Sequence, residues 1–322
     1  MKILYLGHPF FGYYKYIIET LTNDFNVEVD YYNLSPNVYF IYRAIKFNDF
    51  TKKKFLDYFF SKIVQKTTNK KYDIVLVIGV FDYHLPLIEK IKAEHGNAKY
   101  VLYQWDALKT NKYRDLIPFF DKVFSFDRGD CERHKELFYL PLFYIKDYDL
   151  QPNNTPEIDL LFVGSADPER YEIIKKIEKD ARQKKKKFVY YMYIPKLMYL
   201  RKKLFDKSYK KIRFEHVNFK KISHSVIAEL MYKSRAILDI ERFGQSGLTM
   251  RTFETLGAGR KLITTNQNVR HEKFYNPQVI QIISRENPNV DWNLIANSEK
   301  LNNENIIHYS INYWLKKILE IM

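Results

Sequence analysis

The 322-residue chain is poor in cysteine and has no long apolar run. A single cysteine, Cys131, excludes an internal disulfide and any metal cluster built from several cysteines. The adjacent carboxylates Asp130 and Glu132 are expected to raise the pKa of its thiol, so we assign Cys131 no catalytic role. No window approaches the ~18 to 20 uninterrupted apolar residues of a membrane-spanning helix. The first residues, MKILYLGHPFFGYY, are expected to form a buried strand rather than a signal peptide, which predicts a cytoplasmic protein.

The chain has fewer acidic than basic residues: it contains 38 Asp and Glu and 53 Lys and Arg, which gives a net charge of +15. Basic residues concentrate in residues 43–71, in QKKKK (183–187) and in YLRKKLFDKSYKKIR (199–213). These blocks favour an anionic partner, such as the surface of an acidic membrane. The alternative is a lysine-rich solvated surface. No nucleic acid is expected, because no ribonucleoprotein, zinc-finger or helix-turn-helix pattern is present. The 17% aromatic content keeps single-strand binding as a lesser alternative.

The length suits two domains of roughly 150 residues. Short apolar runs alternate with segments of helical period, which is the pattern of parallel strands joined by crossover helices. The expected strands are residues 2–7, 27–32, 72–79, 99–106 and 122–127, then 159–165, 187–194, 212–217, 236–240 and 260–266. The polar segment 147–158 is the expected linker. We therefore predict two doubly wound α/β domains, 1–150 and 151–305, with a terminal helix in 306–322 that packs back on the first.

Glycine is scarce, yet four of the ten glycines lie between Gly244 and Gly259. We expect a loop followed by a helix here. Gly247 allows close backbone approach to a ligand, and the amides at the helix start favour an anion such as phosphate. Those amides belong to Leu248, Thr249 and Met250. Arg251 in the first turn opposes the helix dipole unless an anion is near, and Glu254 is suited to accept hydrogen bonds from two hydroxyls, as a ribose supplies.

Other interpretations of this segment stay open. A glycine-rich connection with a solvated Arg and Glu would have the same composition. Gly257 and Gly259 are expected to serve close packing and the helix end rather than ligand binding. The Gly-Lys-Ser/Thr phosphate loop is absent, and GHPFFG after the first strand lacks the dinucleotide-binding spacing.

The segment GQSGLTMRTFETLGAGRKLITTN (244–266) resembles glycosyltransferases of the GT-B fold, in particular those of bacterial capsule and lipopolysaccharide assembly and spore-maturation glycosyltransferase-like proteins. YQWDALK (103–109), DKVFSFDRGDC (121–131), YLPLFY (139–144) and DLLFVGSADPERY (159–171) fit the same group. The resemblance covers most of the chain. It implies two Rossmann-like domains facing across a cleft, with a nucleotide-diphosphate sugar held by the second domain and an acceptor by the first.

The resemblance also implies roles for single residues. Glu254 matches the glutamate that binds the donor ribose, and the backbone that holds the diphosphate is matched by Gly247, Leu248 and Thr249, assisted by Arg251. Many related enzymes carry a second acidic residue eight positions earlier, where this chain has Ser246. Gln245 or Glu241 is the candidate substitute for contact with the donor sugar. Further donor-site candidates are Gly164 and Ser165 at a strand end, Arg170 and Lys196 as diphosphate cations, and His216 at the base pocket.

A catalytic base is expected at the carboxyl end of a strand in the first domain. Three residues meet this placement: Asp106, which follows Trp105, then His8, then Asp82. Asp106 is alternatively the N-cap of a helix in ALKTNKYRDL.

The sequence thus predicts a metal-independent glycosyltransferase without a bound cofactor. The donor is a nucleotide-diphosphate sugar and the acceptor a glycan or lipid-linked molecule, with the protein peripheral on the inner face of the membrane. The alternatives are a non-catalytic nucleotide-sugar-binding scaffold of the same fold and, less favoured, a single-stranded nucleic-acid-binding protein.

Overall fold

A computed structural model describes residues 1–35, 49–149, 155–299 and 303–320, which form two compact units. Unit 1 comprises Met1–Leu142 and Ile311–Met322, and unit 2 comprises Phe143–Ser310. The first unit therefore ends before the boundary expected at residue 150. Residues 43–48 of the basic segment and 150–154 of the expected linker lie outside the described residues.

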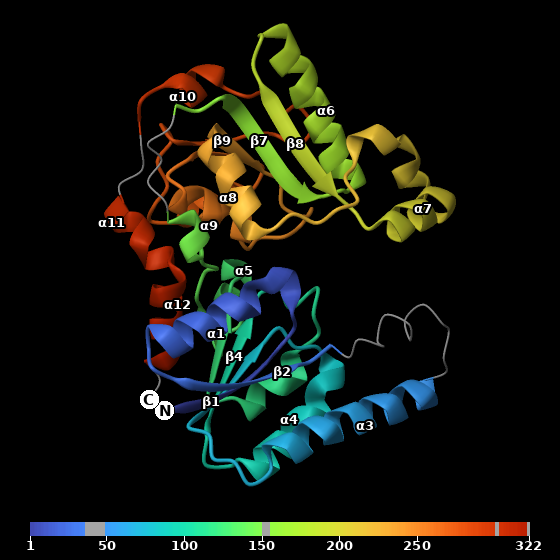
Figure 1. Ribbon diagram of the computed structural model, residues 1–322, viewed down its shortest axis with the longest axis vertical. Helices are drawn as coiled ribbons and strands as arrows, with labels where there is room; N and C mark the ends of the chain where they lie inside the picture. The colour runs from blue at the N-terminus through green and yellow to red at the C-terminus, as the bar shows by residue number, and fades with distance from the viewer. Residues whose placement is uncertain (36–48, 150–154, 300–302, 321–322) are drawn as a thin grey trace. The chain divides into compact units, whose positions relative to one another are not determined.

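Unit 1 is built on a parallel sheet with the strand order β2-β1-β3-β4-β5-β6 (Figure 1). The strands are β1 (Lys2–Gly7), β2 (Glu28–Asn33), β3 (Ile74–Ile78), β4 (Lys99–Gln104), β5 (Lys122–Ser125) and β6 (Leu137–Tyr139). Strand β3 is buried at every position because helices cover both faces of such a sheet. The strand order reverses between β1 and β3. Ligands of doubly wound sheets bind at the carboxyl ends of the strands beside such a switch point.

The helices of unit 1 cover this sheet on both faces. They are η1 (Phe10–Gly12), α1 (Tyr13–Asn23), α3 (Asp49–Thr67), η2 (Asp82–His84), α4 (Leu85–Glu94), η3 (Arg114–Phe119), α5 (Arg128–Arg133) and α12 (Ile311–Leu319), where η marks a 3-10 helix. Alternate strand residues such as Leu4 and Leu6 pack with Phe60 of α3 in one core. On the opposite face of the sheet, Tyr103 of β4 contacts Trp314 of α12, and α12 packs on α1. The last helix of the chain thus belongs to the first unit.

Unit 2 has a parallel sheet with the order β11-β10-β9-β7-β8 (Figure 1). Its strands are β7 (Ile158–Ser165), β8 (Phe188–Tyr193), β9 (Ser234–Asp239), β10 (Lys261–Thr264) and β11 (Ile280–Ile282). Its helices are η4 (Lys146–Tyr148), α6 (Pro168–Gln183), α7 (Lys196–Phe205), η5 (Lys207–Lys211), η6 (Phe214–His216), α8 (His224–Tyr232), α9 (Met250–Gly257), η7 (Gln267–His271), α10 (Trp292–Ala296), α11 (Asn303–Ile306) and η8 (Ile307–Tyr309). The strand order reverses between β7 and β9, which is the switch point of this unit.

The structure confirms nine of the ten expected strands within a few residues and corrects one. Residues 212–217 form no strand, and η6 lies there instead. Ile212 and Val217 are both buried, although a strand would point them to opposite faces. Strands β6 and β11 were not predicted, because three residues each are too few for a readable alternation. Within the described residues, no helix combines the length and the apolar content needed to cross a membrane.

Candidate functional site

Arg170 lies at the switch point of unit 2, where β7 and β9 end. Its Nε donates to the carbonyl of Ile240 (2.8 Å), and its Nη1 donates to the hydroxyl of Ser165 (2.5 Å). Burial lowers the pKa of the guanidinium, while the nearby carboxylates of Asp239 and Asp167 act in the opposite direction. Among the described residues, no carboxylate forms a direct ion pair with Arg170. It is thus a fixed cation held by neutral acceptors, which is an arrangement suited to an anionic ligand.

Helix α9 begins beside the same strand end. The Asp239 carboxylate, the last residue of β9, accepts hydrogen bonds from the hydroxyls of Thr249 and Thr252, both at 2.7 Å. Thr249 is the N-cap, and its oxygen also accepts from the backbone amide of Thr252. The side chain of Asp239 therefore fixes the first turn of α9 against the sheet.

Two asparagines hold the loop before α9 by its carbonyl groups. The Asn266 side chain donates to the carbonyl of Gly247 (3.2 Å), and Asn268 donates to that of Ser246 (3.1 Å). Gln245 also donates to the Gly247 carbonyl (2.9 Å), so this candidate for sugar contact is engaged within its own loop. Gly247 and Leu248 are buried. The loop is thus anchored through its oxygens at the end of β10.

Arg251 and Glu254 form an ion pair inside unit 2. Arg251 Nη1 lies 2.6 Å from Glu254 Oε2, and the Glu254 side chain is only 1% exposed. His224 Nδ1 lies 3.7 Å from Glu254 Oε1 and 2.9 Å from the hydroxyl of Tyr148. Arg251 was expected to need an anion near the start of this helix. The Glu254 carboxylate, three residues further along the helix, is one such anion, and a bound phosphate there stays a prediction. Burial raises the pKa of Tyr148, so its hydroxyl stays protonated.

Glu241 is also engaged within the fold. Its carboxylate pairs with the Arg285 guanidinium and accepts a hydrogen bond from the hydroxyl of Thr265. Arg285 additionally pairs with Glu169 of α6 at 2.7 Å. Burial raises the pKa of Glu241, although both partners oppose this effect. The geometry assigns Glu241 to a buried network that ties β9 to α6.

The remaining donor-site candidates are spread along the end of the sheet. Lys196 is exposed at the start of α7, after β8. His216 lies in η6, with its Nδ1 hydrogen-bonded to the hydroxyl of Tyr171 (2.8 Å), so it is not at a strand end as expected. Gly164 lies within β7, next to Ser165.

Gly257 and Gly259 serve packing and helix termination, as expected. A Cβ at Gly257 would lie 2.6 Å from the ring of Tyr144, so only glycine fits against that ring. Gly259 has a φ of +62°, the left-handed conformation that commonly follows a helix.

In unit 1, His8 lies at the end of β1, beside the switch point. Its Nδ1 is hydrogen-bonded to the hydroxyl of Ser35, and its ring contacts those of His84 and Phe81. Burial lowers the pKa of His8 to about 4, so the imidazole is neutral at pH 7 and is chemically able to accept a proton. Burial also lowers the pKa of His84, to about 3.

The two carboxylate candidates differ in environment. Asp82 is exposed at the start of η2, and its Oδ1 accepts from the amide of Tyr83 (2.8 Å). Asp106 is partly buried, and its Oδ2 accepts from the side chain of Asn111 (3.2 Å). The alternative role of Asp106 as a helix N-cap is wrong, because residues 107–113 form turns and bends.

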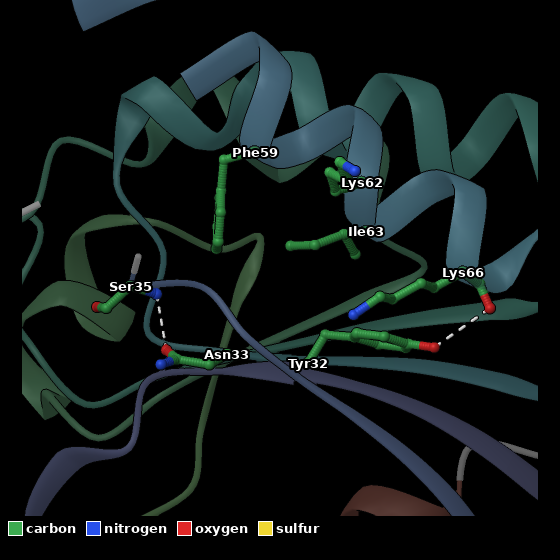
Figure 2. Close-up of a pocket in the computed structure, with 7 residues that line it drawn as sticks. All are labelled: Tyr32, Asn33, Ser35, Phe59, Lys62, Ile63 and Lys66. Atoms are coloured by element: carbon green, nitrogen blue, oxygen red, sulfur yellow. Dashed lines mark hydrogen bonds between the residues drawn. The ribbon is translucent and has the colours of Figure 1, made fainter. Parts of the chain in front are cut away.

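A pocket of about 260 Å³ opens in unit 1 between β2 and α3. Figure 2 shows Phe59, Ile63 and Lys66 reaching from α3 toward the segment that carries Asn33 and Ser35. Its full lining is Tyr32, Asn33, Ser35, Phe59, Lys62, Ile63 and Lys66. Two lysines and two aromatic rings suit a ligand with an anionic group. Ser35 joins this pocket to His8.

No protein-family model and no curated protein matches the chain. Solved structures do match over its whole length. The galactosyltransferase WaaB of the lipopolysaccharide outer core is 13% identical with a TM-score of 0.55, over 99% of this chain and 98% of that one. HepE from Anabaena, in complex with UDP and glucose, is 11% identical with a TM-score of 0.60 over all of both chains. A putative UDP-N-acetylglucosamine 2-epimerase from Listeria monocytogenes is 12% identical with a TM-score of 0.59, over 99% and 94%.

The chain has the GT-B fold. The expected fold class is thereby confirmed. At these identities the likeness establishes the fold alone, and matches that include both transferases and an epimerase leave the activity of a GT-B chain to be argued from its own residues.

Sequence reasoning missed three residues that now belong to the site of this GT-B chain: Asp239, His224 and Tyr148. Asp239 was visible as the last residue of an expected strand beside two threonines. Nothing in the sequence pointed to His224 and Tyr148, because His224 approaches Glu254 from a distant segment and Tyr148 is hydrogen-bonded to His224. The pKa of the Cys131 thiol is raised, as expected, to about 12. The causes are burial and the carboxylates of Asp127 and Asp130, rather than Asp130 and Glu132. In the described part of the chain, no three His, Cys, Asp or Glu residues gather as metal ligands.

Proposed function

We propose that this GT-B chain is a glycosyltransferase that moves a sugar from a nucleotide-diphosphate sugar to a glycan or lipid-linked acceptor in the synthesis of a bacterial surface polysaccharide. The observation that carries the proposal is Arg170: a cation fixed at the switch point of unit 2 without a carboxylate partner among the described residues. Doubly wound sheets bind nucleotides at this position.

The donor diphosphate is proposed to bind where β7 and β9 end. Arg170 and the first turn of α9 lie there, and the exposed Arg242 lies three residues after the end of β9. Lys196 at the start of α7 is the further candidate cation. These groups supply positive potential for an anion without a metal ion, which is the basis for proposing a metal-independent reaction.

Glu254 is proposed to orient the donor ribose, but in this structure Arg251 and His224 surround its carboxylate. Binding of ribose there requires a hydroxyl to replace one of these partners. Substitution by Gln keeps the shape of the side chain and removes the charge. Glu254→Gln therefore tests the ribose role with less disturbance than Glu254→Ala.

In the proposed reaction, an acceptor hydroxyl oxygen forms a bond to the anomeric carbon, and the bond from that carbon to the diphosphate oxygen breaks. The nucleoside diphosphate leaves with the electron pair, and its charge is stabilised by Arg170. The hydroxyl proton passes to a base of unit 1, for which Asp106, His8 and Asp82 are the candidates. The pocket beside Ser35 is the proposed acceptor site, and its lysines favour an acceptor that carries an anionic group.

The test combines donor turnover with product analysis. The full chain is incubated with UDP-glucose, UDP-galactose, GDP-mannose and dTDP-rhamnose, and nucleotides are separated by anion exchange. A glycosyltransferase is expected to hydrolyse its donor slowly when no acceptor is present. The proposal is therefore supported if one donor releases free nucleoside diphosphate, and if this release is lost in Arg170→Ala but retained in Arg182→Ala. Arg182 is a matched control because it lies at the other end of the same helix α6. Conversion of a donor to an isomeric sugar nucleotide, or no consumption of any donor by the folded protein, contradicts the proposal.

A further inference from the structure

Helix α7 turns its apolar residues outward. Leu197 and Leu204 are 83% and 75% exposed, Phe205 is 82% exposed, and Leu200 lies on the same stripe at i, i+3 and i+7 spacing. Among its ten residues only Tyr199 is buried. An ordinary surface helix buries such a stripe against the core.

The inward side of α7 carries lysine stems instead. Lys202 lies over the ring of Tyr209 (4.2 Å to the ring centre). Lys203 donates to the carbonyl of Lys210 (2.8 Å) and lies over the ring of Tyr199. The helix is thus amphipathic with an inverted orientation, and the lysine contacts hold it in that orientation.

The charge of this region has one sign. Residues 196–211 contain seven Lys or Arg and a single acidic residue, Asp206. Five of these basic residues are exposed in or just after α7: Lys196, Arg201, Lys207, Lys210 and Lys211. This combination of an apolar stripe and a basic margin is typical of helices that lie in the interface of an anionic bilayer.

Helix α3 lacks this character, although it belongs to the basic segment in which membrane contact was predicted. Its Phe60 and Ile63 are buried in the core of unit 1, and Tyr58 is its one strongly exposed large apolar residue within the described side chains. Its outward lysines have no apolar stripe beside them. The predicted membrane contact is therefore better assigned to α7 than to α3.

We propose that α7 docks unit 2 on the surface of an anionic lipid bilayer, with Leu197, Leu200, Leu204 and Phe205 entering the headgroup region and the flanking lysines facing lipid phosphates. A second copy of the chain is a poorer occupant, because pairing two such surfaces places like charges together. The inference goes beyond the proposed reaction and rests on the residues of α7 alone.

The test is sedimentation of the full chain with vesicles of phosphatidylcholine alone and of phosphatidylcholine with 30% phosphatidylglycerol (a composition on the order of natural anionic content). We expect binding to the anionic vesicles at low salt. Binding to neutral vesicles, or to anionic vesicles at high salt, should be weaker by a factor of roughly ten or more. The variant Leu197→Ser/Leu204→Ser/Phe205→Ser should bind anionic vesicles about tenfold more weakly. Ile307→Ser is the matched control, since Ile307 is a large apolar residue 60% exposed on another element.

Absence of wild-type binding to anionic vesicles, or equal binding by the triple variant, overturns the proposal. So does a dimer in lipid-free solution that the triple variant abolishes, because it assigns the stripe to a second copy. Thermal unfolding and nucleotide binding of each variant are measured in parallel. A folded triple variant that binds nucleotide normally but not vesicles separates this surface from the donor site.

Discussion

Arg251 Nη1 lies 2.6 Å from Oε2 of Glu254, whose carboxylate is almost fully buried. Both residues were expected to meet a donor nucleotide directly. Their contact with each other shows that the first turns of α9 carry their own charge balance. The position that we propose for the donor diphosphate is the switch point, where Arg170 is held by a carbonyl and a hydroxyl.

Breaking the Arg251–Glu254 pair should be costly. Arg251→Met removes the guanidinium that pairs with the buried Glu254 carboxylate, and we expect a loss of about 3 kcal/mol in the free energy of unfolding. Arg251→Met/Glu254→Gln should recover most of that loss because it removes both charges. Urea unfolding at pH 7 measures both values. A loss below about 1 kcal/mol in the single variant would show that the pair behaves like a solvent-exposed one.

The hydroxyl of Thr252 anchors the start of α9. Thr252→Val keeps the shape of the side chain but removes a hydrogen bond to the buried Asp239 carboxylate, so we expect about 1.5 to 3 kcal/mol of destabilisation. Thr68→Val is the control, because its hydroxyl bonds to a helix carbonyl at an exposed site and its loss should cost less. Equal losses in the two variants would contradict a special role for Asp239.

Gly257 should not tolerate a side chain. The Cβ of Gly257→Ala would meet the ring of Tyr144 at 2.6 Å, and we expect a loss of about 1 to 3 kcal/mol from overpacking. Gly96→Ala is matched, since its Cβ would find its nearest neighbour at 3.5 Å, an ordinary contact. The melting temperatures of both variants are compared with that of the wild type. An unchanged melting temperature in Gly257→Ala would refute the close packing.

Stability should fall in mild acid because His84 is buried and neutral. Its folded pKa is lowered to about 3, whereas the unfolded value is ~6.5. The unfolded chain therefore binds the extra proton first, and stability is complete above pH ~6.5 and declines as the pH falls toward 3. At pH 4.5, about two units below the unfolded pKa, the contribution lost is about 3 kcal/mol. His84→Gln should reduce the slope of stability against pH between 6.5 and 4.5, and an unchanged slope would mean that other groups cause it.

Most of the fold could be predicted from the sequence because buried parallel strands are nearly continuous apolar runs. IVLVI of β3 and the run that ends at Gly164 stand out against the charged helices between them. The segment 212–217 gave a wrong prediction because its Ile and Phe alternate with charged residues. In the structure Ile212 is buried and Phe214 is 56% exposed, although residues two apart on a strand would share one face.

Part of the site was also readable from local spacing. The position of Arg170 after a strand follows from neighbouring residues, and so does the helix start after Gly247, although α9 begins at Met250 rather than at Leu248. The surroundings of Glu254 could not be predicted in this way. His224 and its hydrogen-bond partner Tyr148 come from other elements, and only the packed fold shows that the carboxylate is buried. A charged pair three residues apart looks the same in sequence whether it is solvated or enclosed.

The most direct test of the account is thermal unfolding of the wild type, Arg170→Ala and Arg182→Ala in the presence of UDP, GDP, dTDP and CMP. A nucleotide at ~100 times its dissociation constant adds about 2.7 kcal/mol of apparent stability. If the donor binds at the switch point, one nucleoside diphosphate stabilises the wild type and Arg182→Ala, and Arg170→Ala loses this gain while its unliganded stability is retained. Equal stabilisation of Arg170→Ala, or no stabilisation of the wild type by any nucleotide, would contradict a donor site at the switch point of unit 2.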